Sequence, residues 1–430
     1  LRCCAGIRRS SPSWLRVLGG AFGAVTLASS PLFWSQATVT EVYTLNTFFA
    51  MSLVLITTYV VFDPSHDHTK KLFAFGLMLG LGLGNHLTLL GVAVPLIVWM
   101  CSAIGLRRGL SIWAIVGLSI GLSIYIYLPI RASQTPAVNW GNADSLSGFV
   151  WMLTGGPYQE YVLGVSVDMV GDRLIPWLNL VFSQFNPLGL FFGLMAGGVL
   201  LSRSPRLLGA ISSSAVLLLI YSISYRTVDY QVMMLPVFLM FSIFVGIGFF
   251  WALSAWLSPV LKGDVVTIGW LSIRNELVVV TTAISVFVLV PGISVLLNYE
   301  SQNLRYDRVA YDYAWNVIDS VPEDSLVLSD NEKSAFSLWY MRYGEDLEPN
   351  FVPVSVRLLQ FDWYRRDLFE TYPDVIPEVD SDDVHAVMET IIEYSDPGGV
   401  YFTFNPRFVS DRFSVERLGL VWKVTVSKDG

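Results

Sequence analysis

The chain has 430 residues, of which 53% are hydrophobic and only 14% carry a charge. This composition excludes an ordinary soluble protein, and the 14 Trp and 19 Tyr suit the interfacial belts of membrane proteins. The formal net charge of −8 argues against a nucleic-acid binder, and three cysteines are too few for a disulfide framework. The composition predicts an α-helical polytopic membrane protein with a polar C-terminal region.

The beginning of the chain does not look like the start of a protein. It opens with Leu1, and its first ten residues, LRCCAGIRRS, match neither a signal peptide nor a start-like segment. We therefore expect an N-terminally truncated fragment.

Long stretches free of charge predict the membrane spans, because a basic side chain at a span centre costs about 2.5–3.5 kcal/mol. The runs are Trp14–Trp34 (with Arg16 near its start), Tyr43–Phe62, Leu72–Leu106, Leu110–Ile130, Leu178–Leu201, Leu207–Ser222, Met233–Leu257 and Leu277–Leu297.

The run Leu72–Leu106 is too long for one crossing, since a single helix of this length would measure roughly 50 Å. Basic pairs precede it at residues 70–71 and follow it at residues 107–108, and short basic loops favour the cytoplasmic side. The run is therefore predicted to be a hairpin that turns near Gly84, Asn85 and His86. The prediction is about nine spans, with the N-terminus of the fragment cytoplasmic and the chain after Leu297 outside.

This topology gathers the unusual polar residues on the outer side. Glu41 lies in the polar link SQATVTEVYTLN (Ser35–Asn46) between two apolar runs, without a basic residue nearby. The long outer loop, residues 131–177, opens with Arg131 and contains a predicted interfacial helix around Phe149–Leu153. The complete predicted set is Glu41, Asn85, His86, Arg131, Asn139, Tyr158, Arg226 and Asp229.

Such a set suits a lipid-linked phosphate or a metal ion, because guanidinium makes forked hydrogen bonds to phosphate oxygens. Simpler structural roles stay open for each residue. Glu41 suits an interfacial helix cap, Asn85 and His86 suit a tight turn, and Arg131 suits a snorkelling anchor. Arg226 and Asp229 suit a surface ion pair.

The C-terminal region predicts a small α/β domain outside the membrane. Its predicted helices are Tyr306–Ser320, Ser334–Tyr343, Leu358–Tyr372 and Val384–Tyr394, and its predicted strands are Ser325–Leu328, Phe351–Val354, Val400–Phe404 and Leu418–Val426. The expected organisation is a transmembrane domain at residues 1–298, including the outer loop at 131–177, followed by an extracytoplasmic α/β domain at residues 299–430.

Several motifs in order resemble a known family. They are FWSQATVTEVYTLN, GLGLGNHLTLL, YLPIRA, NWGN, SLWYMRYG and FDWYRRDL. The chain resembles bacterial membrane proteins related to transmembrane protein 260, the protein O-mannosyltransferase-like group. The resemblance implies a glycosyltransferase of GT-C type that moves a sugar, mannose being one candidate, from a polyprenyl-phosphate carrier to a protein or glycan acceptor outside the membrane.

The resemblance also implies residue roles. In this superfamily the principal catalytic acid lies in the first outer loop, and neither that acidic motif nor its HPPG-like segment is present here. We therefore expect the acid upstream of Leu1 and expect the fragment to be inactive alone. Glu41 becomes a secondary catalytic acid, and Arg131 a candidate for the carrier phosphate. Asn85, His86, Asn139 and Tyr158 would line the substrate site.

No individual residue is assigned as a metal ligand, although the use of a divalent cation stays open. A polytopic transporter or lipid flippase is the alternative function. It would require ionisable groups or broken helices near the bilayer midplane. A non-catalytic assembly or receptor protein is a third interpretation.

Overall fold

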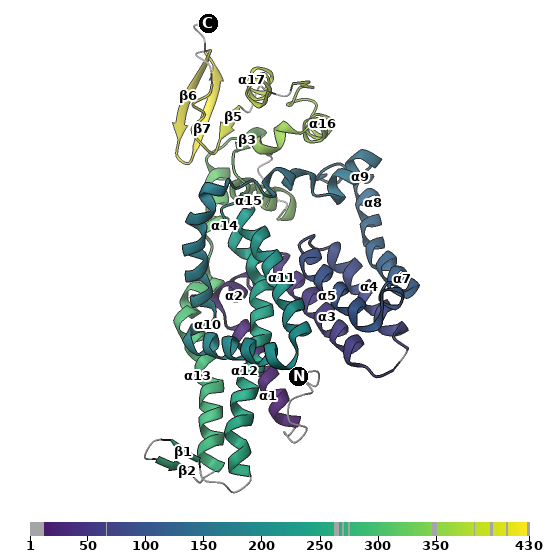
Figure 1. Ribbon diagram of the computed structural model, residues 1–430. Coiled ribbons are helices and arrows are strands. Elements are labelled where there is room, and N and C mark those ends of the chain that lie inside the picture. Colours follow the sequence, from purple (N-terminus) through teal and green to yellow (C-terminus); the bar gives the residue numbers. More distant parts are fainter. Residues whose placement is uncertain are drawn as a thin grey trace. The chain divides into compact units, whose positions relative to one another are not determined.

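The computed structural model describes residues 13–65, 67–261, 266–268, 271–273, 276–345, 351–381, 383–395, 399–409 and 412–427 (Figure 1). Residues 1–12, on which the truncation prediction rests, lie outside this part. The chain forms two compact units: residues 1–125 with 157–304, and residues 126–156 with 305–430. The second unit thus includes the first part of the long loop. The domain boundary at residue 298 stays a prediction.

Every charge-free run forms a helix or a helix pair. Apart from α9, which is described below, the α-helices between residues 13 and 302 are α1 (Ser13–Ala28), α2 (Pro31–Ala37), α3 (Tyr43–Phe62), α4 (Thr69–Leu83), α5 (Leu89–Ile104), α6 (Leu106–Gly109), α7 (Ile112–Leu122), α8 (Tyr127–Ala132), α10 (Val167–Arg203), α11 (Pro205–Ser224), α12 (Leu235–Leu261) and α13 (Glu276–Gln302). The predicted hairpin is confirmed, because α4 and α5 are separated by a turn at residues 84–88.

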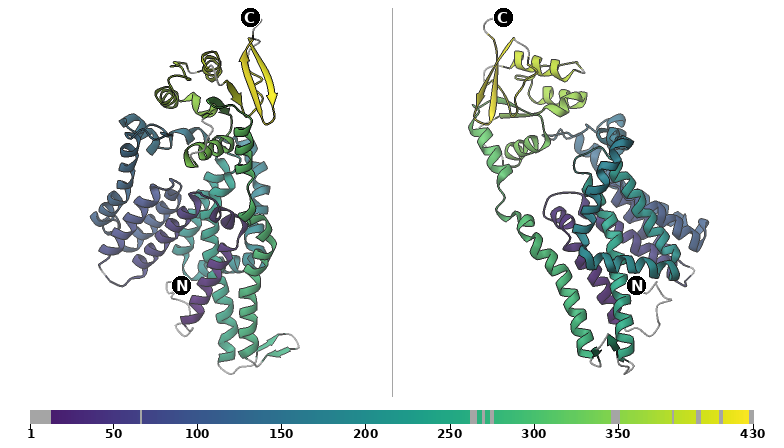
Figure 2. Two further views of the ribbon diagram at one scale, coloured as in Figure 1. Left: turned by 180° about the vertical axis from the view of Figure 1, so that it is seen from behind. Right: turned by 60° about the vertical axis from the view of Figure 1, so that its left-hand side comes forward.

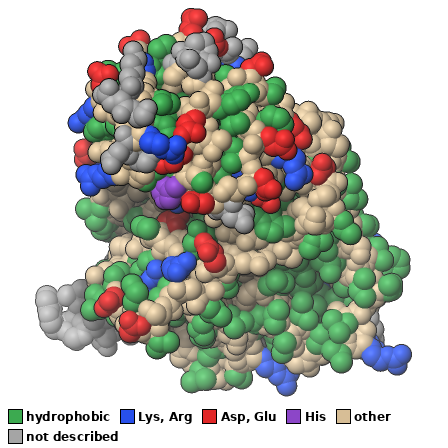
Figure 3. Space-filling model, turned by 90° about the horizontal axis from the view of Figure 1, so that it is seen from above, with side chains coloured by type: hydrophobic (Ala, Val, Ile, Leu, Met, Phe, Trp, Pro, Cys, Tyr) green, Lys and Arg blue, Asp and Glu red, His purple; other side chains and the backbone are tan. Residues whose placement is uncertain are grey.

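Within the described residues, six helices are long and apolar enough to cross a membrane, and a seventh results if the bent pair α1–α2 counts as one span. This number is below the predicted nine because α4 and α5, with 15 and 16 residues, are shorter than a full crossing. Large apolar side chains such as Leu194 (73% exposed) face outward, as lipid-facing residues do. Figure 3 shows broad areas of hydrophobic side chains with few charges between them.

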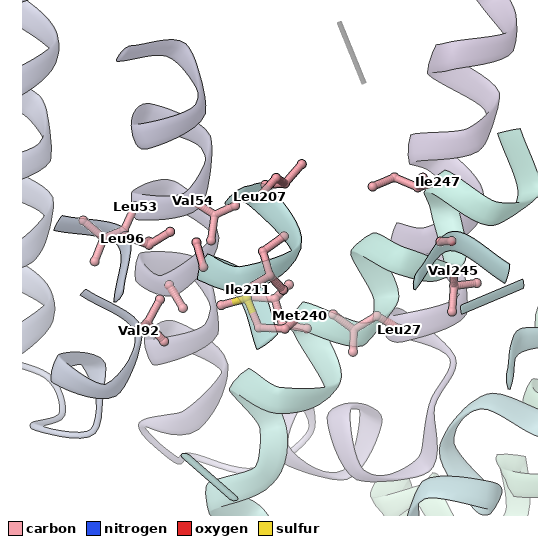
Figure 4. Close-up of a cluster of buried hydrophobic side chains, with 14 of the residues drawn as sticks. Leu27, Leu53, Val54, Val92, Leu96, Leu207, Ile211, Met240, Val245 and Ile247 are labelled. Carbon is pink, nitrogen blue, oxygen red and sulfur yellow. The ribbon is translucent and has the colours of Figure 1, made fainter. Parts of the chain in front are cut away.

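Helices of the first unit pack through apolar side chains and glycines. Figure 4 shows part of its core, to which α1 (Leu27), α3 (Leu53), α5 (Leu96), α11 (Ile211) and α12 (Met240) all contribute side chains. Helices α4 and α7 approach so closely that a Cβ atom at Gly80 would lie 2.5 Å from the Leu118 carbonyl oxygen. Glycine therefore allows these two helices to approach closely. Helices α12 and α13 run side by side and are joined through the short hairpin of β1 (Val266–Ile268) and β2 (Leu271–Ile273) (Figure 2).

The second unit is an α/β structure, as predicted. Its sheet has the order β4-β3-β5-β7-β6, in which β3 pairs in parallel with β4 and β5, while β7 pairs antiparallel with β5 and β6. The strands are β3 (Ser325–Ser329), β4 (Phe351–Ser355), β5 (Val400–Phe402), β6 (Phe413–Leu418) and β7 (Val421–Val426). The α-helices are α8 and α9 (Leu146–Leu153) from the loop, and α14 (Val309–Asp319), α15 (Glu332–Trp339), α16 (Asp362–Thr371) and α17 (Val384–Tyr394).

One strand differs from the prediction. The expected last strand, Leu418–Val426, is the second half of a hairpin whose first strand is β6. The turn contains Gly419, whose φ of +60° is easy only for glycine. Strand β6 was not predicted because it lies at the sheet edge, where the exposed charges Glu416 and Arg417 interrupt the apolar pattern of a strand.

Candidate functional site

The turn between α4 and α5 is tied to the beginning of α3. The Asn85 side-chain amide donates to the Val42 carbonyl oxygen at 3.0 Å, and the Asn46 amide donates to the Thr88 hydroxyl at 3.1 Å. The Thr88 hydroxyl lies 2.8 Å from His86 Nδ1. This nitrogen also accepts the Thr88 backbone N–H at 3.2 Å, so the His86 proton is assigned to Nε2.

These contacts give His86 a defined chemical state. Burial lowers the pKa of its imidazole, which favours the neutral ring. With Nδ1 accepting from Thr88, the neutral ring offers its Nε2–H as a hydrogen-bond donor. The His86 ring centre lies 5.7 Å from that of Tyr43, the first residue of α3.

Tyr43 is the centre of a polar group that we call the Tyr43 cluster, formed by Glu41, Tyr43, His86, Tyr158, Tyr225 and Asp229. Glu41, Tyr158, Tyr225 and Asp229 are all close enough to act electrostatically on the Tyr43 phenol. Glu41 and Asp229 are exposed. The cluster therefore brings together two accessible carboxylates, a neutral imidazole donor and three phenols from separate segments of the first unit.

Arg173 of α10 fixes the segment that carries Tyr225 and Asp229. Its guanidinium donates to the carbonyl oxygens of residues 223, 225 and 227 at 3.1, 2.6 and 3.3 Å, and lies 4.4 Å from the centre of the Tyr230 ring. The predicted ion pair between Arg226 and Asp229 is not among the ion pairs of the described residues. Instead, the Arg226 guanidinium lies over the Tyr161 ring, at 6.0 Å. Asp229 thus has no salt-bridge partner in this part of the chain.

The six predicted site residues divide between the two units. Glu41, Asn85, His86 and Tyr158 belong to the first unit and lie in or beside the Tyr43 cluster. Arg131 and Asn139 belong to the second unit, where the exposed Arg131 donates to Gln134 at 3.0 Å and Asn139 is 7% exposed. Their participation in one site with Glu41 stays a prediction.

Tyr43, Thr88 and Tyr225 were not among the predicted site residues. Tyr43 and Tyr225 flank apolar runs, where aromatic residues are common and carry no particular signal. Thr88 was detectable only through its spacing from His86. In the described part of the chain, no group of three or more His, Cys, Asp or Glu side chains lies close enough to hold a metal ion.

The fold and these sites define a helical, multi-pass membrane protein with a C-terminal α/β region. Residues 7–108 match the family model of the protein O-mannosyl-transferase TMEM260 N-terminal domain. The chain is 24% identical over 376 residues to the mouse protein O-mannosyl-transferase TMEM260, which covers 83% of this chain and 52% of that protein. It is 23% identical over 386 residues to the Dictyostelium discoideum protein of the same name, covering 80% and 46%.

These matches confirm the resemblance and support the TMEM260-like family for this chain. The chain spans about half the length of the curated relatives that it matches.

Proposed function

We propose that this chain forms part of a membrane glycosyltransferase of GT-C type. It transfers a sugar, mannose by analogy with the names of its relatives, from a polyprenyl-phosphate carrier to a protein acceptor outside the membrane. The observation that carries this proposal is the Tyr43 cluster. Its two exposed carboxylates, neutral imidazole and phenols are the groups that remove a hydroxyl proton and bind sugar hydroxyls.

In the proposed reaction the acceptor hydroxyl oxygen attacks the anomeric carbon and forms the new C–O bond. The bond from that carbon to the carrier phosphate breaks, and its electron pair leaves with the phosphate. Glu41, as a secondary acidic group, assists removal of the hydroxyl proton, and Arg131 stabilises the charge on the leaving phosphate. Asn85, His86, Asn139 and Tyr158 hold the substrates through hydrogen bonds.

The test uses membranes that contain the protein expressed from its complete gene. They are supplied with radiolabelled polyprenyl-phosphate mannose and a secreted protein acceptor. We expect Glu41→Gln and Asp229→Asn to lower the transfer rate by roughly 10²-fold, the usual scale for a proton-transfer group. Glu300→Gln, an exposed carboxylate at the end of α13, is the matched control. Transfer at the normal rate by Glu41→Gln would exclude Glu41 from the chemistry.

A specific observation also favours a transporter or lipid flippase as the second candidate. Helices α1 and α2 meet at an angle of 71°, and α10 is interrupted at Asn186, whose φ is +46°. The buried Gln184 side chain of α10 accepts, through its Oε1, the backbone N–H of Leu32 in the first turn of α2 at 2.9 Å. Broken helices of this kind form the substrate sites of many transporters.

The two candidates are separated in proteoliposomes. A flippase moves a fluorescent polyprenyl phosphate between leaflets without any sugar acceptor, and Gln184→Leu would slow that movement. A transferase produces labelled acceptor and needs no net movement of the carrier.

The proposed orientation places the N-terminal side of α1 in the cytoplasm and the α/β region outside. The basic loops at residues 70–71 and 107–108 support it. In intact cells, an impermeant thiol reagent should label a cysteine introduced at residue 374 and leave one introduced at residue 107 unlabelled. The reverse pattern would invert the topology.

A further inference from the structure

The three parallel strands of the second unit have a doubly wound arrangement. Strand β3 lies between β4 and β5 and is parallel to both. After β3 the chain enters α15, and Leu338 of that helix packs with Val327 on one face of the sheet. After β5 the chain turns to the opposite face, where Phe404 packs against a core that includes Leu328. The two connections therefore diverge at the carboxyl ends of β3 and β5, and ligands of open α/β sheets bind at such a point.

A row of hydroxyl groups lies across these strand ends. Ser329 of β3 and Ser355 of β4 are register partners, and Thr403 follows Phe402, the residue of β5 that pairs with Leu328. The Thr403 backbone N–H donates to the Leu328 carbonyl oxygen at 2.9 Å, which extends the pairing by one residue. Because side chains alternate along a strand, all three hydroxyls lie on the face that carries α15.

Two of these hydroxyls are buried without a hydrogen-bond partner in the described part of the chain. Ser329 is 1% exposed, and neither its Oγ atom nor the Oγ1 atom of Thr403 has a partner there. A buried hydroxyl without a partner costs free energy in the folded protein. The row therefore indicates a partner that the described residues do not supply.

The beginning of α15 adds further donors at the same edge of the sheet. Asn331 caps the helix through its side chain, whereas the backbone N–H groups of Glu332 and Lys333 have no carbonyl one turn earlier in the helix. The Arg357 side chain is held at this edge, because its Nε–H donates to the Asp330 carbonyl oxygen at 2.7 Å. Since N–H groups can only donate, the site requires a ligand with several acceptor oxygens.

The side-chain charges at this edge nearly cancel, because Lys333 and Arg357 attract an anion whereas Asp330 and Glu332 repel it. The free N–H groups and the positive end of the helix dipole then favour an anion. We propose that this edge binds a phosphate group, at a location that we call the strand-end site and that is formed by Ser329, Glu332, Lys333, Ser355, Arg357 and Thr403. The site belongs to the second unit, and it does not rest on the proposed transfer reaction.

The first measurement is hydrogen–deuterium exchange of the complete protein, followed in peptides that cover residues 328–336. Inorganic phosphate is compared with chloride at equal ionic strength. We expect phosphate to slow exchange at the beginning of α15 in a saturable manner. The double variant Ser329→Ala, Thr403→Val should raise the Kd roughly tenfold or more, because hydrogen bonds to a charged group are lost.

The control for this measurement is Ser337→Ala, since the Ser337 hydroxyl donates to the Lys333 carbonyl oxygen within α15, at 2.7 Å. It should bind phosphate as the unmodified protein does. No protection by phosphate in the unmodified protein, or an unchanged Kd in the double variant, would overturn the proposal, because water would then satisfy the hydroxyls.

Asp330→Asn tests the sign of the ligand charge. The variant removes a repelling charge and keeps an oxygen that can accept the hydrogen bond from the Asn331 side-chain amide, at 2.9 Å. We expect phosphate to bind several-fold more tightly, whereas Arg357→Gln should bind it more weakly. Weaker binding by Asp330→Asn would contradict an anionic ligand.

Thermal unfolding in phosphate-free buffer separates a binding role of Ser329 from a structural one. Ser329→Ala should unfold at an unchanged or slightly higher temperature, because it removes a buried polar group that has no partner. A clearly lower midpoint would overturn the proposal, since the hydroxyl would then be bonded within the chain.

The source of the phosphate group is decided with two further probes in the exchange measurement. Glycerol 3-phosphate in solution represents a soluble phosphate ester, and nanodiscs that contain phosphatidic acid represent a lipid headgroup. Protection by the first probe identifies a soluble ligand, and protection by the second probe alone identifies a lipid. Protection by neither would overturn the assignment of a site for phosphate esters.

Discussion

Thr88 is the residue through which the turn at residues 84–88 controls the state of His86. Its hydroxyl accepts from Asn46 and lies at hydrogen-bond distance from His86 Nδ1. Thr88→Val keeps the shape and removes both bonds, leaving the buried Asn46 amide without its acceptor. We expect the free energy of unfolding to fall by about 1–3 kcal/mol. Thermal unfolding in detergent checks this.

Ser52→Ala is the control for that measurement, since the Ser52 hydroxyl bonds only to a carbonyl of its own helix, at 2.8 Å. Equal midpoints for Thr88→Val and Ser52→Ala would show that the Asn46–Thr88–His86 chain contributes nothing to stability.

Asp367 gives a second prediction at this scale, which concerns pH. Burial raises the pKa of its carboxyl to about 6, and the nearby charge of Glu370 reinforces this shift, whereas the polar backbone of Asn139 opposes it. The folded unit therefore binds this proton more tightly than the unfolded chain, whose carboxyl titrates near 4. The stability of the unit should fall as the pH rises from about 4 to about 6, by an amount on the order of 1 kcal/mol after allowance for solvent screening.

Exchange protection of β3 at pH 5 and pH 7.5, corrected for the intrinsic rate, measures this effect. In Asp367→Asn the contribution of this residue disappears, so the variant should lose less protection between the two pH values. An identical loss in both proteins would show that Asp367 does not carry this pH dependence.

Sequence patterns could identify only part of the Tyr43 cluster. Asn85 and His86 were recognisable because polar side chains are rare in an apolar hairpin. Glu41 was recognisable because a charged side chain is rare in a short link between two apolar runs. Tyr43 and Tyr225 gave no such signal. For Asp229 the sequence favours an ion pair with Arg226, because the order of charges along the chain does not reveal that Arg226 lies over Tyr161.

Among the elements, the pair α4 and α7 offers the sharpest test of packing. A Cβ atom at Gly80 would lie 2.5 Å from the Leu118 carbonyl oxygen and 2.8 Å from Gly121 Cα, both parts of a backbone that cannot rotate away. We expect Gly80→Ala to lower the free energy of unfolding by about 1–3 kcal/mol. Gly20→Ala in α1, where the new atom meets open space, should be neutral or slightly stabilising.

Thermal stability of the purified protein in detergent compares the two glycine variants. If Gly80→Ala were as stable as Gly20→Ala, the close approach of α4 and α7 would not contribute to folding.

Helices were predictable because charge-free length is a direct physical requirement of a hydrocarbon core. Breaks inside the helices were harder to predict from the sequence. The bend between α1 and α2 occurs at Ser29, Ser30 and Pro31, yet the whole stretch reads as one apolar run. In the α/β region, α17 was predicted with its observed bounds, while the charged edge strand β6 was missed.

At the scale of the molecule, the unexpected feature is that residues 126–156 belong to the C-terminal unit. No local sequence pattern indicates a contact between segments so distant in the chain, and the sequence therefore predicts the loop as part of the membrane domain. Trp140 packs against the core of the α/β unit, which includes Leu328 and Phe402. Without the loop, this apolar surface is left uncovered.

We therefore expect a synthetic peptide of residues 134–156 to stabilise a separately produced domain of residues 305–430. At saturating peptide the unfolding midpoint should rise by a few degrees, through preferential binding to the folded state. A peptide with Trp140→Ala and Gly141→Ala should have a much weaker effect. Equal effects of both peptides would argue against the specific contacts of the NWGN segment.

The discontinuous second unit also sets an order of events during synthesis. Trp140 emerges from the ribosome long before Trp363, and at about 5–20 residues per second the interval is roughly 10–50 s. During that time the NWGN segment and Trp151 have no partner, while α10 to α13 are still being made and inserted. The NWGN segment must therefore remain soluble and available until residues 361–363, which carry its aromatic partners, have been translated. This places a demand on its sequence that comes from biogenesis rather than from the finished fold.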